Sequence, residues 1–329
     1  MYDLLKITNS RLRRLQTLTF LTRLNFMNSI TKKSIHWTSS VAVFCALFAL
    51  HPLKATAATL SNDWNYAIDS FNDGVTETVI GGDFEFYGMA IRETSDTAFI
   101  AINSNLSLAG YADSDAARGN INYGDLFFNF SGQNFNTASA NNSLFAVRFA
   151  EGNDSGVATT GVYKDVTAKS VTQTNSGFSN LNQYNTLVAS KGGTPSMGDL
   201  AATDPYFQQT GNNTILTSIA TGTKVGDIEF LTAATLSALG LNFGQFNAVG
   251  SQTIGFSFNK SSLSSGDFIA NFIAECANDA LAIKGKFKPV PEEGKVQPVP
   301  EPSTLVGTFV GLSFLGSRAA KRKMKRKIS

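Results

Sequence analysis

The chain has 329 residues, enough for one or two domains, and its formal net charge of +2 hides a marked asymmetry. Residues 1–57 and 289–329 contain 8 Lys and Arg residues each, whereas residues 58–288, here called the body, contain 11 against 21 Asp and Glu residues. An acidic body is repelled by phosphate backbones, so nucleic acid is excluded as a partner.

The rare residues exclude several kinds of site from the body. Both histidines, His36 and His51, precede the body, which contains a single cysteine, Cys276. Without histidine, the usual proton shuttle near neutral pH is missing. We therefore expect no intramolecular disulfide, no Ser-His-Asp or Cys-His catalysis and no zinc site of the usual His/Cys kind in the body.

The amino-terminal end is predicted to be an extended signal peptide. The basic pair at residues 32–33 precedes an apolar stretch at 41–50, which is long enough for an export signal and short for a membrane span. Ala55 and Ala57 supply the small residues that signal peptidase reads, so cleavage is expected after Ala57. Because the preceding segment adds nothing recognisable, we take Met27 as the start of translation.

Short apolar or alternating runs, separated by Gly, Asn, Asp and Ser, dominate the body and are typical of β-strands. Residues 83–93 and 97–103 flank a tight polar turn and are predicted to form a hairpin. A short helix is predicted at 232–239, closed by Gly240. Further strands are predicted at 124–130, 143–150, 166–171, 226–231 and 252–258. This pattern favours a mainly β fold, a β-sandwich that is jelly-roll-like.

Two acidic loops of the body offer candidate calcium ligands. One loop contains Asp69 and Asp73, and the other contains Asp113 and Asp115. Carboxylate oxygens suit Ca²⁺, which is abundant where exported proteins go. The simpler interpretation is that each side chain caps its own turn, in which case the protein has no cofactor.

Carboxylates are also the only plausible catalytic groups, because paired acids hydrolyse glycosides when they face each other across a cleft. The sequence distinguishes no pair, and the following acids are interpreted as turn formers or surface charge: Asp63, Asp69, Asp73, Glu85 and Asp125. We therefore predict that the protein is not an enzyme. Aromatic side chains offer an alternative function, a sugar-stacking surface, although in such a body they more often form the core: Trp64, Tyr66, Tyr87, Tyr123, Tyr163 and Tyr184.

The carboxy-terminal end has the organisation of a membrane-directed tail. Residues 289–302 are Pro-rich, so they are predicted to form an extended linker that ends in Pro300, Glu301 and Pro302. The 15 residues of 303–317 carry no charge and would span roughly 22 Å as a helix, against a hydrocarbon core of roughly 30 Å. The positive-inside rule retains the basic cluster that follows in the cytoplasm: Arg318, Lys321, Arg322, Lys323, Lys325, Arg326 and Lys327.

Linker, Pro-Glu-Pro, apolar helix and basic cluster, in this order, resemble the PEP-CTERM tail of exported bacterial proteins that exosortases process. The resemblance implies cleavage near residues 300–302, followed by release of the body or its transfer to an extracellular carrier. A plain single-pass anchor is the alternative. The prolines support the sorting interpretation, because they prevent an unbroken helix and keep the peptide extended for a protease.

A second resemblance is carried by five segments of the body: residues 64–74, 87–93, 124–132, 145–157 and 161–172. These segments resemble the cyanobacterial exosortase-dependent surface proteins of the XDD type. The resemblance implies extracytoplasmic display and no assigned chemistry.

The pattern of apolar residues in 266–287, taken by itself, fits either a helix or strands. Residues 275–279 resemble the Glu-Cys-Gly-Asn-Asp element that often precedes such tails, with Ala277 in place of glycine. The resemblance favours a strand, a turn at 277–279 and a last strand at 280–287, with Cys276 as a buried small apolar residue.

Four regions are thus predicted: the signal peptide (1–57), the body (58–288), the linker (289–302) and a transmembrane helix with a basic cytoplasmic tail (303–329). We expect an exported cell-surface or matrix protein with a structural or adhesive role; the alternative is a carbohydrate- or calcium-binding surface module. The expected partners are signal peptidase, exosortase, the membrane and an extracellular polysaccharide.

Overall fold

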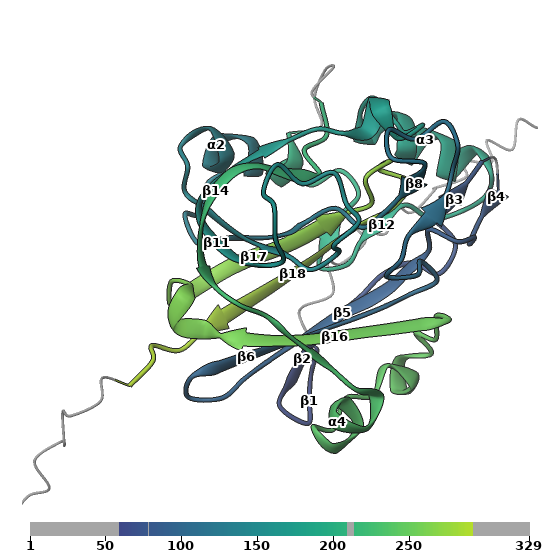
Figure 1. Cartoon of the computed structure of the whole chain (residues 1–329). Helices are drawn as coiled ribbons and strands as arrows, with labels where there is room; N and C mark the ends of the chain where they lie inside the picture. Colours follow the sequence, from purple (N-terminus) through teal and green to yellow (C-terminus); the bar gives the residue numbers. More distant parts are fainter. Residues whose placement is uncertain (1–58, 78, 209–213, 292–329) are drawn as a thin grey trace, which may run out of the picture. The chain divides into compact units, whose positions relative to one another are not determined.

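The structure, a computed structural model of the chain, describes residues 59–77, 79–208 and 214–291. β-Strands dominate this part of the chain (Figure 1). The mainly β class predicted from the sequence is therefore confirmed. The predicted signal helix and transmembrane helix lie outside the described residues. Within the described ranges, none of the helices combines the length and the hydropathy that a bilayer crossing needs.

Two six-stranded antiparallel sheets form the framework of the body. The first has the order β1 (Thr59–Ser61), β2 (Trp64–Ile68), β5 (Phe86–Glu93), β6 (Thr97–Ser104), β16 (Gln252–Asn259) and β15 (Glu229–Leu231). The second has the order β14 (Ser218–Gly226), β11 (Gly161–Lys169), β10 (Leu144–Arg148), β9 (Leu126–Asn129), β17 (Gly266–Ile273) and β18 (Ala280–Phe287).

Short two-stranded sheets and helices connect and cover this framework. The strand pairs are β3 (Val75–Thr76) with β4 (Val79–Ile80), β7 (Tyr111–Ala112) with β8 (Asn120–Ile121), and β12 (Ser196–Met197) with β13 (Leu200–Ala201). The helices are α2 (Phe135–Ala140), α3 (Leu181–Ser190) and α4 (Ala233–Ala238), with 3₁₀ turns η1 (Thr172–Thr174), η2 (Pro205–Phe207), η3 (Phe243–Phe246) and η4 (Lys260–Ser262).

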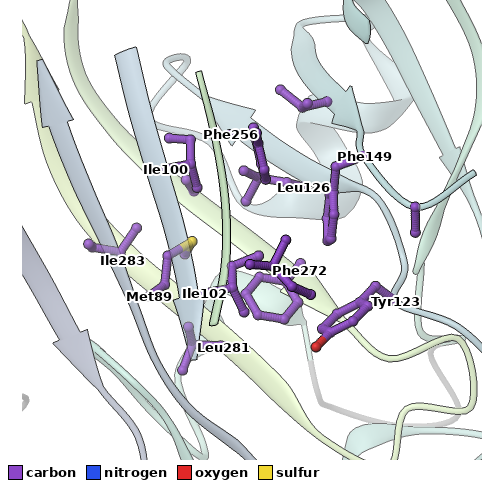
Figure 2. Close-up of a cluster of buried hydrophobic side chains, with 14 of the residues drawn as sticks. Met89, Ile100, Ile102, Tyr123, Leu126, Phe149, Phe256, Phe272, Leu281 and Ile283 are labelled. Carbon is purple, nitrogen blue, oxygen red and sulfur yellow. The ribbon is translucent and has the colours of Figure 1, made fainter. Parts of the chain in front are cut away.

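The main hydrophobic core lies between the two sheets. Met89 and Ile102 reach it from the first sheet, and Phe272 and Leu281 reach it from the second (Figure 2). The Phe272 ring centroid lies 4.7 Å from that of Phe86, which joins the two layers through an aromatic contact. This arrangement is consistent with the predicted β-sandwich.

The outer face of each sheet is covered as well. On the first sheet, Trp64 and Tyr66 form a second core with Leu236 of α4 and Phe243 of η3. On the second sheet, α2, α3 and η2 contribute to a third core. Because several strands are buried on both faces, their sequences are nearly continuous apolar runs instead of strict alternations.

Most of the predicted elements are present with shifted ends. The hairpin is β5 and β6, paired from Glu93 with Ala98 onward, and the predicted short helix is α4, with Gly240 at a φ of 80°. The strand predicted at 166–171 is the end of the longer β11, and the run 226–231 is divided between the end of β14 and β15. The helices α2 and α3 were not predicted.

Residues 266–287 form two antiparallel strands, β17 and β18, which pair from Gly266 with Phe287 to Ile273 with Ala280. The turn between them contains Ala277 at a φ of 56°, a backbone conformation that glycine adopts without steric cost. Cys276 is fully buried, and burial raises the pKa of its thiol. The strand interpretation and the buried cysteine are both confirmed.

Candidate functional site

Two of the four predicted calcium ligands lie in a buried cluster of carboxylates. Asp69 and Asp73, in the loop after β2, meet Glu85, just before β5, and Asp279, in the turn before β18. Asp73, Glu85 and Asp279 are fully buried, and Asp69 is 6 % exposed. We call these four residues the acidic cluster. Its members belong to three chain segments that only the folded structure brings together.

The loop after β2 is held by the segment around β12. The backbone N–H of Gly198 donates to Asp69 Oδ1 at 3.0 Å, and that of Ser196 donates to Asp73 Oδ2 at 2.7 Å. That segment is in turn held against the second sheet, because Gly198 forms a bridge with Ala282 of β18. Asp69 and Asp73 therefore do not simply cap their own turn.

A close backbone contact fixes Glu85 beside this loop. A Cβ atom on Gly74 would lie 2.3 Å from Cα of Glu85, so only glycine fits at this position. The contact allows the Gly74 N–H to donate to Glu85 Oε2 at 2.8 Å. The glycine that ends the acidic loop is thus required by the packing of the cluster.

Asp279 is held by three donors. The Phe86 N–H donates to its Oδ2 at 2.7 Å, while the Ala280 N–H and the Tyr184 hydroxyl donate to its Oδ1 at 2.7 and 3.1 Å. Tyr184 comes from α3 and is fully buried. The carboxylate therefore links the first sheet, the last turn of the second sheet and the helix that covers that sheet.

The electrostatics of the acidic cluster disfavour its ionisation. Burial raises the pKa of Asp69 and of Glu85 to about 7. Burial, together with repulsion from Asp69 and Glu85, raises the pKa of Asp73 to about 9. The pKa of Asp279 is raised by burial and by repulsion from the other three carboxylates. Without a positive charge nearby, burial and mutual repulsion keep the cluster from carrying its full negative charge at neutral pH.

Asp113 and Asp115, predicted as a second calcium loop, do not join the acidic cluster. Asp113 Oδ1 accepts the backbone N–H of Asp115 at 2.8 Å, so it caps its own turn. Both residues line a surface cavity of about 570 Å³, together with Glu77 and Tyr111. For the loop that contains Asp113 and Asp115, the structure therefore favours the simpler interpretation, a turn capped by its own side chain, over a calcium site.

A second group of buried acids forms a hydrogen-bonded network around the end of β17. Glu275 accepts the Asn122 N–H at 2.8 Å and also the Asp154 N–H, and burial raises its pKa to about 7. Asp125 accepts Asn153 Nδ2 at 2.9 Å. These carboxylates satisfy backbone and amide donors and thereby fix neighbouring loops.

Two interpretations of the sequence need correction or refinement. The acids interpreted as turn formers or surface charge are mostly buried: Asp69, Asp73, Glu85 and Asp125 lie inside, and only Asp63 is exposed. The expectation that the aromatic residues belong to the core is confirmed for Trp64, Tyr66, Tyr123, Tyr163 and Tyr184, while Tyr87 is half-buried.

The predicted processing sites lie outside the described residues. These are the signal-cleavage residues Ala55 and Ala57, the motif Pro300, Glu301 and Pro302, and the basic cluster Arg318, Lys321, Arg322, Lys323, Lys325, Arg326 and Lys327. They remain predictions from the sequence.

Comparisons with protein-family models, with curated proteins and with solved structures found no match to this chain. A proposal about function therefore rests on the geometry of the body.

Sequence reasoning missed Glu85, Asp279 and Tyr184 as parts of the site. Asp279 is the last residue of the segment 275–279, which resembles the Glu-Cys-Gly-Asn-Asp element. This resemblance was the available signal that Asp279 has a specific role. Glu85 stands between two phenylalanines that are both buried in the structure. An ionisable residue in such an apolar run is a signal of a buried and partnered charge.

Proposed function

We propose that this chain is an exported, non-enzymatic surface protein whose body is displayed outside the cytoplasm after signal peptidase and exosortase have removed its two ends. One observation carries the proposal. Within residues 59–291, where the structure describes the chain apart from two short gaps, the first strand begins at Thr59 and the last ends at Phe287, so both sheets lie between the two predicted processing points. Removal of both ends would therefore leave every strand of the two described sheets in place.

The position of the terminal strands agrees with this proposal. β1 is an edge strand of the first sheet and β18 is an edge strand of the second. After β18, the backbone N–H of Lys288 donates to Glu93 Oε2 at 3.1 Å, which fixes the point where the linker leaves the body. Chain ends at sheet edges can be cleaved without opening the core.

The burial of the carboxylates supports a structural role for them. A glycosidase presents two carboxyl groups to a sugar in an open cleft, whereas the acidic cluster is closed to solvent. The buried aromatic residues likewise favour packing over sugar stacking. A jelly-roll-like topology is part of the proposal and is supported by β17, which returns to lie beside β9 after the meander of β9, β10, β11 and β14.

The test is mass spectrometry of the protein recovered from a producing cell with and without its exosortase. We expect an amino terminus at Ala58 in both cells, and a carboxyl terminus near Pro300 only when exosortase is present. Glu301→Ala should block the second cleavage, while Pro298→Ala, in the linker outside the motif, should leave it unchanged. A retained leader would refute export, and processing that is independent of exosortase would refute sorting by the tail.

A further inference from the structure

The buried carboxylates leave three oxygen atoms without a hydrogen-bond donor. In the described part of the chain, Asp69 Oδ2, Asp73 Oδ1 and Glu85 Oε1 are buried and accept no hydrogen bond. The other oxygen of each carboxylate accepts a backbone N–H. An unpaired buried acceptor is costly, and one cation bound among these carboxylates would remove that cost.

Two of these carboxylates, those of Asp69 and Asp73, converge with the carboxylate of Asp279. Asp69, Asp73 and Asp279 each offer one oxygen, and these three oxygens lie within 4.8 Å of one another. Calcium binds oxygen at about 2.3–2.6 Å, so ligand atoms on opposite sides of one ion are up to about 5 Å apart. The spacing therefore accommodates one calcium ion among the three side chains.

The donors around the acidic cluster are electrically neutral. They are backbone N–H groups and the Tyr184 hydroxyl, which fix the carboxylates without neutralising them. The ion pairs that the described lysines and arginines form involve other acids, such as Lys260 with Glu93 and Arg118 with Asp154. The described lysines and arginines therefore do not supply the positive charge that would let all four acids ionise.

We propose that the acidic cluster is a calcium site, in which Asp69, Asp73 and Asp279 bind the ion and Glu85 supplies a fourth carboxylate beside it. The ligand atoms determine which metal ion fits the site. Carboxylate oxygen alone suits a hard cation, and Ca²⁺ tolerates the irregular, largely dehydrated setting that Mg²⁺ resists. The site differs from the two loops suggested by the sequence, because it combines residues from three distant segments.

The ion would act as a cross-link between the two sheets. Asp69 and Asp73 follow β2, and Glu85 precedes β5, both strands of the first sheet; Asp279 precedes β18 of the second. A cation bound there holds the two sheets together and stabilises the folded state, because the unfolded chain cannot assemble the site. The inference concerns the folded body and does not depend on how the protein is sorted.

Equilibrium dialysis of the full-length protein against Ca²⁺, combined with thermal unfolding in calcium and in chelator, tests the proposal. We expect one calcium ion per chain and a higher melting temperature in calcium. At free calcium about 100 times the dissociation constant, the ratio of folded to unfolded protein should rise about 100-fold.

Variants assign the site. Asp73→Asn should abolish calcium binding and the calcium-dependent shift. It should not lower stability in chelator, because the amide oxygen of asparagine can still accept the Ser196 N–H. Asp113→Asn is the matched control and should bind calcium as the unmodified protein does. If the carboxylates of the acidic cluster serve only to accept backbone N–H groups and bind no calcium, Asp73→Asn will instead destabilise the protein equally in calcium and in chelator.

Three results would overturn the proposal: folded full-length protein that binds no calcium, a calcium response that Asp113→Asn abolishes and Asp73→Asn retains, or tighter binding of Mg²⁺ than of Ca²⁺. The calcium count on the unmodified protein decides the matter even if the Asp73→Asn variant fails to fold.

Discussion

Replacing Glu275 by glutamine should change how the stability of the protein depends on pH. The carboxyl group is buried and accepts two backbone N–H groups, from Asn122 and Asp154. Burial raises its pKa from the ordinary 4.5 to about 7. Because the folded-state pKa is the higher one, the protonated form is favoured by folding. Its contribution to stability is complete below about pH 4.5 and is lost as the pH rises through about 7.

The pKa sets the size of the effect. A rise from 4.5 to about 7 corresponds to about 3 kcal/mol of stability that the unmodified protein loses over this interval. Glutamine does not titrate, but its amide NH₂ leaves one of the two backbone N–H groups without an acceptor, at a cost of about 1–3 kcal/mol at every pH. The Glu275→Gln variant should thus be less stable than the parent at low pH, and this difference should shrink or reverse by about pH 8.

The assay is urea unfolding of both proteins between about pH 5 and pH 8, in calcium throughout so that the acidic cluster contributes equally to both. The difference in unfolding free energy between the two proteins isolates the titration of Glu275. A difference that stays constant with pH would show that Glu275 titrates alike in the folded and unfolded chain and would refute the reasoning. A difference that widens as the pH rises would show that the folded state prefers the carboxylate.

Three further substitutions test the packing by denaturant unfolding in calcium. Phe272→Ala empties the centre of the main core and should cost about 3–5 kcal/mol, whereas Phe230→Ala, at a side chain 47 % exposed, should cost less than about 1 kcal/mol; similar losses would contradict the core assignment. Gly177→Ala places a Cβ 2.2 Å from the carbonyl oxygen of Cys276 and should destabilise by about 1–3 kcal/mol, so a neutral result would deny this contact. Thr232→Ala removes the side chain that caps α4, and a loss of about 1 kcal/mol is expected; no loss would mean that the cap is dispensable.

The strands could be predicted because their signals are local. The hairpin of β5 and β6 combines two apolar runs with a polar turn, and α4 combines a capping threonine with Gly240. The helix α3 was missed although its signals were present. Asn180 caps it, and its buried residues, Leu181, Tyr184 and Val188, are spaced at three and then four positions. The polar residues between them obscured this short pattern.

The candidate site could be predicted only in part because its members are distant in sequence. Asp69 and Asp73 stood out as an acidic loop, and so did Asp113 and Asp115. The sequence alone could not distinguish these two loops. In the first, the carboxylates accept hydrogen bonds from a distant segment, whereas in the second Asp113 caps its own turn. Glu85 and Asp279 reach the site only after β5 pairs with β2 and β17 pairs with β18, which is a property of the sheets.

Native mass spectrometry tests both proposals most directly, because one spectrum reports both processing and bound metal. The protein is isolated from the surface of cells grown in calcium-containing medium. We predict the mass of the body with both ends removed, plus one calcium ion that is lost on unfolding. The mass of the full-length chain would contradict the proposed display, and a processed body that carries no metal in calcium-containing buffer would contradict the cross-link between the sheets.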